Sequence, residues 1–433
     1  MSRGPFGIHS LGRWGVLATG LLVVLATGAL WLGWPSQPVA VPASAVASDP
    51  TTIERGRYLA TLGNCQHCHT PPGAAPYAGG RALPTPFGTV FTSNLTPSAQ
   101  GLGGWSAGDF WRALHHGQSR DGRWLIPAFP FANTTHVTRT DSDALFAYLQ
   151  SLPPVDTRTP PHQLAWPYNT QAALKVWRAL YFSPAEPQAP TVAANAEWAR
   201  GAYLVQGLGH CGACHAERNA LGATSAMAAL GGGLLPGQGW YAPSLTNPAE
   251  AGLQDWPLAQ IMALFRTGQA GGHFTTGPMA AVVQHSSQHW TEGDLQAMAT
   301  YLQQLPRTAA PAARAAPAPS TRQAELGAKV YGQQCVQCHG EQGEGVRLAD
   351  GRFAYPPLAG SRAVNLGTAA NLLQVMLHGG FSVSSLSQPR PFGMPPYVLA
   401  LGDAELAAVL THLRTQWGNV GAPVSEVDLA RLR

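Results

Sequence analysis

Apolar residues recur at helical spacing in nine stretches of the chain, and these stretches form three sets with the same internal order. Each set has an opening helix, a second helix that ends at glycine, and a closing helix with apolar residues at helical spacing. Asp or Thr before the closing helix is a favourable N-cap. The predicted helices are 54–64, 109–117 and 141–152; 199–210, 260–268 and 292–305; and 325–334, 371–379 and 403–417. A repeat of this length indicates a mainly α-helical protein built from a triplicated domain.

Proline- and alanine-rich segments separate the three sets, at 183–195 and 306–322. Segments of this composition are semi-extended linkers. We therefore expect boundaries near 190 and 315. The resulting organisation is an N-terminal region at 1–48 and domains at 49–190, 191–315 and 316–433.

The N-terminus has a different pattern, because residues 14–34 contain no charged side chain. About 20 apolar residues are needed to cross a bilayer as a helix, and Arg3 and Arg13 favour a cytoplasmic N-terminus. A signal peptide usually has a shorter apolar core, although Ala-Ser-Ala at 43–45 could serve as a cleavage site. With or without cleavage, the sequence predicts export. We expect a bacterial inner-membrane protein with an N-terminal anchor and a periplasmic body.

Composition narrows the function classes. The chain has 433 residues, of which only 11% are charged, against about 25% in a typical soluble domain. Glycine and proline are frequent (49 and 37), which predicts long loops between the helices. The net charge of +4 is small and scattered, whereas nucleic-acid binding requires a basic face, so no nucleic-acid partner is expected.

All six cysteines occur in Cys-x-x-Cys pairs followed directly by histidine. The motifs are Cys65, Cys68 and His69; Cys211, Cys214 and His215; and Cys335, Cys338 and His339. Cys-x-x-Cys-His is the attachment motif of c-type haem. The two thiols each bond one vinyl group of the haem, and the histidine supplies the proximal iron ligand. The sequence therefore predicts three covalently attached haems c.

Other interpretations of the cysteines fit less well. A zinc ribbon has two Cys-x-x-Cys pairs about 15–20 residues apart, whereas these pairs are more than 100 residues apart. A thioredoxin-type redox motif does not require the histidine that follows each pair.

Methionine is the common distal ligand of c-type haems, and it is expected in the loop between the second helix and the closing helix. Met279 occupies this place in the second set and Met394 in the third. The other methionines of these sets, except Met227 in an Ala/Gly-rich loop, lie on apolar helix faces and are expected to fill the core.

The first set departs from this pattern, because Phe129 stands where the methionine is expected. Phenylalanine cannot bind iron, so either a histidine is the sixth ligand or the position is open or occupied by water. His136 is nearest in the loop; the other candidates are His115, His116 and His162. Without methionine, this haem is expected to have the lowest potential of the three.

These motifs, with PFGTVFTSNLTP (86–97), GLGGWSAGDFWRALHHG (101–117) and GPMAAVV (277–283), carry a family resemblance over about residues 50–420. The chain resembles the triple-haem cytochrome c subunits of bacterial membrane-bound alcohol, gluconate and aldehyde dehydrogenases. The Ala-Phe-Pro variant at Phe129 and the segment 167–182 are more similar to cytochromes of molybdenum-containing aldehyde or N-heterocycle dehydrogenases.

The resemblance implies three tandem class I-like cytochrome c domains that act as an electron-transfer subunit, with no catalytic residues of its own. It implies electron uptake from a molybdenum-type or quinoprotein dehydrogenase subunit and delivery to ubiquinone or a terminal oxidase. The sequence departs from the family in lacking methionine at Phe129 and in its N-terminal anchor, since many members have a C-terminal membrane helix.

Three alternatives remain: a free electron shuttle, an oxidase-associated cytochrome, and an enzyme that binds a small ligand at an open first haem. The role of the segment 167–182 also has two interpretations. Leu174, Trp177, Leu180 and Phe182 form an apolar face that either straps the first two units together or docks the catalytic subunit.

Overall fold

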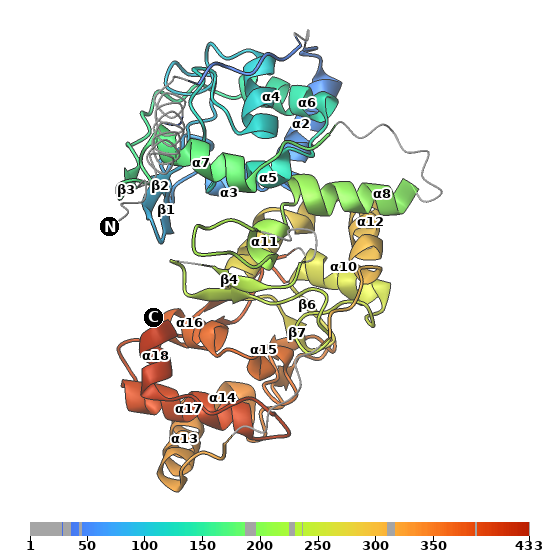
Figure 1. Ribbon diagram of the computed structural model, residues 1–433. Helices are drawn as coiled ribbons and strands as arrows, with labels where there is room; N and C mark the ends of the chain where they lie inside the picture. The colour runs from blue at the N-terminus through green and yellow to red at the C-terminus, as the bar shows by residue number, and fades with distance from the viewer. Residues whose placement is uncertain are drawn as a thin grey trace, which may run out of the picture.

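A short helix at a Cys-x-x-Cys pair follows each opening helix in the computed structural model. The structure describes Gly28 and residues 36–42, 46–186, 196–224, 230–235, 237–309, 317–385 and 388–432. We call residues 46–186 the first part, 196–309 the second part and 317–432 the third part. Figure 1 shows the first and third parts at opposite ends, with the second between them.

The helices of the first part are α2 (Pro50–Leu62), α3 (Cys65–Cys68), α4 (Ala107–His116), α5 (Phe131–Thr134), α6 (Arg139–Gln150) and α7 (Gln171–Tyr181). Its strands β1 (Ala82–Thr85), β2 (Gly88–Phe91) and β3 (Gln163–Leu164) form one antiparallel sheet, in which Leu83 pairs with Val90 and Gly88 with Leu164.

The second part contains α8 (Ala196–Tyr203), the π-helix η1 (Leu204–Leu208), α9 (Gly212–His215), α10 (Leu258–Thr267), α11 (Gly277–His285), the 3₁₀ turn η3 (Ser287–His289) and α12 (Glu292–Gln303). Its strands form the hairpins β4 (Gly233–Leu235) with β5 (Trp240–Ala242), and β6 (Gln269–Ala270) with β7 (His273–Phe274).

The third part contains α13 (Thr321–Gln334), α14 (Val336–His339), α15 (Arg362–Asn365), α16 (Ala370–His378), α17 (Asp403–Thr415) and α18 (Glu426–Leu432). Its hairpins are β8 (Val346–Arg347) with β9 (Phe353–Tyr355), and β10 (Gly380–Phe381) with β11 (Gly393–Met394). All nine helices predicted from the hydrophobic pattern are confirmed, with shifts of a few residues at their ends.

The opening and closing helices of each part cross in contact: α2 with α6, α8 with α12, and α13 with α17. A glycine lies at each crossing: Gly56 against the Ala144 carbonyl, Gly201 against the Ala297 carbonyl, and Gly327 against the Ala408 carbonyl. Any Cβ at these glycines would overlap the carbonyl oxygen. Glycine therefore permits the close helix contact in all three parts.

This contact gives a stability prediction with a matched control in α13. Gly327→Ala is expected to destabilise the protein by about 1–3 kcal/mol, because the methyl group forces the two helices apart. Gly332 lies exposed in the same helix with no atom near its Cβ position, so Gly332→Ala should stabilise by about 0.5–1 kcal/mol. Denaturant unfolding followed by circular dichroism measures both; equal effects at the two sites would contradict the explanation.

Two hydrophobic clusters form the interior. One is shared by the first and second parts and includes Leu59, Leu62, Leu204 and Leu208, each at most 3% exposed. The other belongs to the third part and is centred on Leu373, Leu406 and other residues of α16 and α17. The first two parts are therefore joined through a common core, whereas the core of the third is separate.

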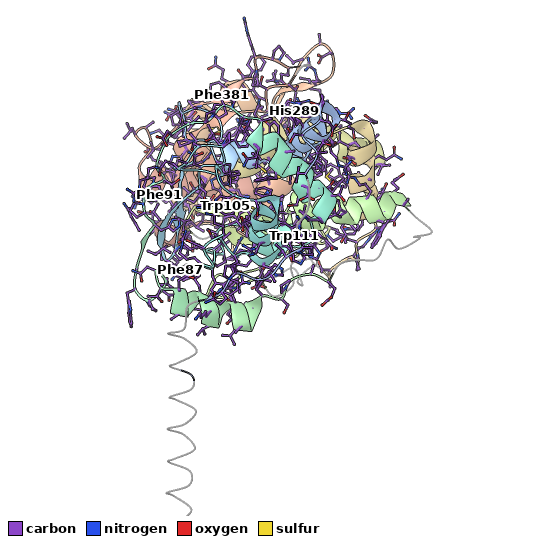
Figure 2. All side chains as sticks on the ribbon, turned by 90° about the horizontal axis from the view of Figure 1, so that it is seen from above. Phe87, Phe91, Trp105, Trp111, His289 and Phe381 are labelled. Atoms are coloured by element: carbon purple, nitrogen blue, oxygen red, sulfur yellow. The ribbon has the colours of Figure 1, made fainter. Side chains whose placement is uncertain are left out.

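The helix α7 packs on the rest of the protein by one face. Leu174 is buried, and the Arg178 guanidinium lies 4.0 Å from the centre of the Trp124 ring. The Trp177 indole donates to the Leu221 carbonyl of the second part at 2.9 Å, so the strap interpretation is confirmed for these residues. Leu180 is 63% exposed and does not belong to that buried face. Figure 2 shows Phe87 beside α7 at the edge of the molecule; its ring lies 4.5 Å from that of Tyr168.

Among the described residues, no helix is both long and apolar enough to span a bilayer. The span predicted at 14–34 lies outside the described residues except for Gly28, as does the candidate cleavage site at 43–45. The segment 36–42 is described and pairs with the first part, where Arg112 donates to the Val39 carbonyl at 2.7 Å and Val39 N–H donates to Gln118 at 2.8 Å.

Candidate haem-binding sites

Each Cys-x-x-Cys pair lies at a single helical turn: α3 contains both cysteines of the first pair, whereas Cys211 and Cys335 are the N-caps of α9 and α14. In each motif the histidine N–H donates to the carbonyl of the first cysteine at 2.9 Å: His69 to Cys65, His215 to Cys211, and His339 to Cys335. Residues i and i+3 of a helical turn lie on one side of it, so both thiols of a motif can reach the same flat ligand. All six thiols are free and half-buried.

The three histidines are oriented in the same way. Nδ1 of His69 lies 2.7 Å from the Ser93 carbonyl, Nδ1 of His215 lies 2.7 Å from the Pro243 carbonyl, and Nδ1 of His339 lies 3.0 Å from the Pro356 carbonyl. Because a carbonyl only accepts, Nδ1 must carry the hydrogen, which leaves the lone pair of Nε2 available for a metal.

The electrostatic environment keeps these rings neutral. Burial lowers the pKa of His69, His215 and His339, and the hydrogen bond to the carbonyl opposes this only in part. A metal ligand must be the neutral imidazole. Three half-buried, neutral histidines with a fixed tautomer suit the proximal position of a haem iron.

The carbonyls that orient these three histidines were not predicted from the sequence. Each follows the second strand of a hairpin: Ser93 after β2, Pro243 after β5 and Pro356 after β9. They lie 24, 28 and 17 residues after their histidines. A backbone carbonyl at variable spacing leaves no signal in side-chain identity; only the hairpins themselves could have indicated it.

A zinc site is not supported by the surroundings of the thiols. Burial raises the pKa of Cys65 and Cys211 to about 12 and that of Cys335 to about 11, whereas zinc binds the thiolate. Within the described ranges, no three His, Cys, Asp or Glu side chains come together as a metal cluster.

Met279 and Met394 each lie between the second and the closing helix of their part, Met279 in the helix α11 and not in the loop that the sequence predicts. Met279 is in the first turn of α11 and packs half-buried on the same cluster as Cys211. Met394 ends β11, pairs with Gly380 of β10 and packs on the same cluster as Cys335. Each of the two methionines thus shares a hydrophobic cluster with the first cysteine of its own motif. Met227 lies outside the described residues.

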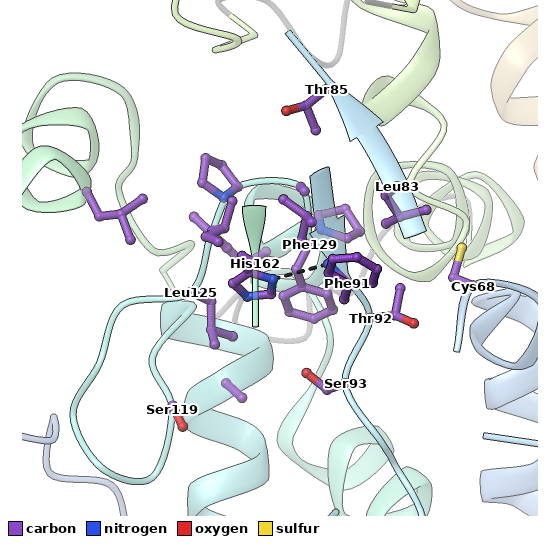
Figure 3. Close-up of a pocket in the computed structure, with 18 of the residues that line it drawn as sticks. Cys68, Leu83, Thr85, Phe91, Thr92, Ser93, Ser119, Leu125, Phe129 and His162 are labelled. Atoms are coloured by element: carbon purple, nitrogen blue, oxygen red, sulfur yellow. Dashed lines mark hydrogen bonds between the residues drawn. The ribbon is translucent and has the colours of Figure 1, made fainter. Parts of the chain in front are cut away.

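A cavity of about 2290 Å³ opens beside the first motif. Its lining includes Cys65, Cys68, His69 and Phe129, and Figure 3 shows Phe129 and His162 within it. Pockets for small ligands usually measure about 300–1,000 Å³, so this cavity has room for a haem and for a further ligand. Phe129 faces the same cavity as the first cysteine pair, as its match to Met279 and Met394 predicts.

The structure separates the histidine candidates for the first site. His136, His115 and His116 do not line the cavity; His115 is stacked on Trp111 at 4.2 Å, and His136 lies close to Gly207 of the second part. His162 does line it. The predicted ligand His136 is thus not brought into the cavity with Cys65, Cys68 and His69.

His162 presents a donor to the cavity, not a lone pair. Its Nδ1 accepts the Phe91 N–H at 3.1 Å (Figure 3). Burial, with a smaller contribution from Arg123, lowers the pKa of His162 and favours the neutral ring. The remaining hydrogen is therefore on Nε2, the reverse of the tautomer of His69. This ring can donate to a cofactor carboxylate or to a small ligand in the cavity.

Comparisons with known proteins agree with this chemistry. The sequence model of the cytochrome c family matches residues 198–306 and 324–417. The cytochrome c subunit of a quinone-linked alcohol dehydrogenase of Gluconobacter oxydans is 34% identical over 90% of this chain and 84% of its own length. A nicotinate dehydrogenase subunit of Pseudomonas putida is 36% identical over 91% of this chain and 32% of its own length. A diheme cytochrome c-type protein of Cereibacter sphaeroides is 36% identical over 67% of this chain and 98% of its own length.

Proposed function

Because this chain belongs to the cytochrome c family, among the cytochrome c subunits of bacterial dehydrogenases, we propose that it is a membrane-tethered electron-transfer subunit with three haems c. Members of this group transfer electrons and are distinct from the catalytic subunits of their complexes. The observation that carries the proposal is the threefold recurrence of a Cys-x-x-Cys turn with a histidine held by a carbonyl at Nδ1.

The haem count follows from the three equivalent motifs. In this proposal domains 49–190, 191–315 and 316–433 each hold one haem through their two thiols, with His69, His215 and His339 as proximal ligands. Met279 and Met394 complete the iron coordination in the second and third domains. The bound haems supply reversible one-electron chemistry, and the protein sets the potentials through the axial ligands.

The partners are inferred from the relatives. Electrons would enter from a periplasmic catalytic subunit of the molybdenum or quinoprotein type and leave to ubiquinone or a terminal oxidase. The apolar segment 14–34 would hold the chain on the periplasmic side of the inner membrane. Leu180 and Trp166, which are 63% and 80% exposed, leave apolar surface at the cavity beside the first motif.

The test is co-purification from native membranes in mild detergent. We expect a dehydrogenase in stoichiometric amount by mass spectrometry, and reduction of the haems when its substrate is added. Reduction by a primary alcohol would indicate a quinoprotein partner, and reduction by nicotinate a molybdenum-type partner. Recovery of the chain alone at every detergent concentration would contradict the proposal and favour a free shuttle.

A further inference from the structure

Two acidic residues at equivalent places make the same set of hydrogen bonds in the first and second parts. Asp141 accepts from Arg55 of its own part at 2.9 Å, and Asp294 accepts from Arg200 of its own part at 2.8 Å. Each is the third residue of its closing helix, and each N–H donates to the capping threonine three residues earlier at 3.2 Å. Each of these sets of hydrogen bonds lies within one part, and it recurs because the two parts have the same order of helices.

The same two carboxylates are also bonded across the boundary, in a reciprocal way. Tyr203 of the second part donates to Asp141 of the first part at 2.6 Å. Tyr58 of the first part donates to Asp294 of the second part at 2.7 Å. Burial raises the pKa of both phenols, so both remain donors. The Asp141 and Asp294 side chains are only 3% and 11% exposed.

An exchange of equivalent bonds is the signature of an isologous, two-fold interface. Arg-Gly-x-Tyr occurs at 55–58 and again at 200–203, whereas the third part has Leu326 and Lys329 at the matching places. The first and second parts are therefore related by a local two-fold axis, and the third part lacks the residues for this interface.

The axis brings the first two Cys-x-x-Cys-His motifs together. His210, directly before Cys211, has Nε2 3.3 Å from the Gly63 carbonyl, two residues before Cys65. His67, inside the first motif, stacks on His285 of α11 with 4.5 Å between ring centres. Cys68 and Cys214 line one cavity. The π-helix η1 (Leu204–Leu208), which has no counterpart in the first part, lies between α8 and Cys211.

We propose, building on the proposed function, that Tyr58 and Tyr203 hold the first two haem-binding motifs in a two-fold arrangement, in which their haems would form a pair close enough to exchange electrons directly. An electron passing between them oxidises one iron from ferrous to ferric and reduces the other from ferric to ferrous, and no other reactant is needed. The third haem exchanges electrons with this pair as a separate centre. The diheme relative, which has about two thirds of this chain, is consistent with a self-sufficient pair.

The test is electron paramagnetic resonance of the oxidised holoprotein. We expect two haem signals that broaden each other and a third that behaves as an isolated centre. The coupled pair should persist in the Cys335→Ala/Cys338→Ala chain, which lacks the third haem and keeps both motifs of the pair. Uncoupled signals in the native chain, or loss of the pair in this variant, would overturn the inference.

The role of the tyrosines is tested by Tyr58→Phe/Tyr203→Phe, which leaves both Arg–Asp pairs intact. We expect loss of the mutual broadening, while all three haems stay attached. Tyr241→Phe is the matched control, because its hydroxyl donates to the Glu250 carboxylate at 2.9 Å within the second part alone; it should keep the coupled pair. If the double variant keeps the magnetic coupling, Tyr58 and Tyr203 do not fix the geometry of the pair.

Peptide mass spectrometry of the native sample tests haem attachment separately from the pairing of the first two haems. Absence of haem from the first or second motif would contradict the proposed function. Two attached haems without magnetic coupling would contradict only the pairing.

Discussion

Replacing both Cys335 and Cys338 by alanine is expected to yield a chain with two covalent haems instead of three. The two thiols are the only points of covalent attachment in the third part, because the chain has no other cysteine there. The third part has its own hydrophobic cluster, so the first two haems should be retained. The pyridine haemochrome assay and the mass of the intact chain measure the loss directly.

The same variant is expected to unfold locally. His339 and Met394 would lose the cofactor between them, and the part of the cluster on which Met394 packs would be exposed to water. Limited proteolysis should then cut within 317–432 and spare the first two parts. Met394→Leu is the control: it keeps both thiols and should keep three attached haems. Three haems in the double-cysteine variant would show that the motif is not the attachment site.

The sequence predicts the regular helices well because their signal is local. Each of the nine helices has an apolar face at helical spacing, and two of the closing helices have a threonine N-cap, Thr138 and Thr291, as predicted. The third closing helix has Gly402 as its N-cap, where Asp or Thr was expected. The cysteine motifs are equally local, since four consecutive positions of one turn carry both thiols and a fifth carries the histidine. Nothing outside the turn is needed to identify them.

Features that join distant segments were not predicted. The hairpins that supply the Ser93, Pro243 and Pro356 carbonyls are two to four residues per strand, too short for a clear alternating pattern. The reciprocal Tyr58 and Tyr203 bonds depend on how two repeats face each other, although the matching positions of the tyrosines were visible. In the segment 167–182 the spacing predicted Leu174 and Leu180 on one apolar face, so it could not show that Leu174 is buried and Leu180 is exposed.

Closeness in sequence to Phe129 did not identify the histidine that lies in the cavity of the first haem site. His136 lies seven residues after Phe129 but does not line the cavity, whereas His162, from a more distant loop, does. Its tautomer depends on one backbone N–H, that of Phe91. Only the folded structure reveals that this ring offers a hydrogen where an iron ligand needs a lone pair.

Phe129→Met is expected to convert the first haem from an open to a closed iron site. In the native protein we expect cyanide to bind one of the three oxidised haems, because Phe129 offers no ligand and His162 presents N–H to the cavity. Methionine at 129 would occupy the place that Met279 and Met394 hold in the other parts. Cyanide binding should then be lost, and the potential of this haem should rise by at least about 60 mV, a tenfold change in a one-electron equilibrium.

Phe87→Met is the matched control for this change. Phe87 lines the same cavity from the loop between β1 and β2, against Tyr168, and it does not occupy the place of the missing ligand. Its replacement should leave both cyanide binding and the lowest potential as they are in the native protein. If cyanide binds none of the native haems, a side chain already fills the sixth position. If it binds one haem equally well after Phe129→Met, the open iron belongs to another motif, and the equivalence of Phe129 with Met279 and Met394 fails.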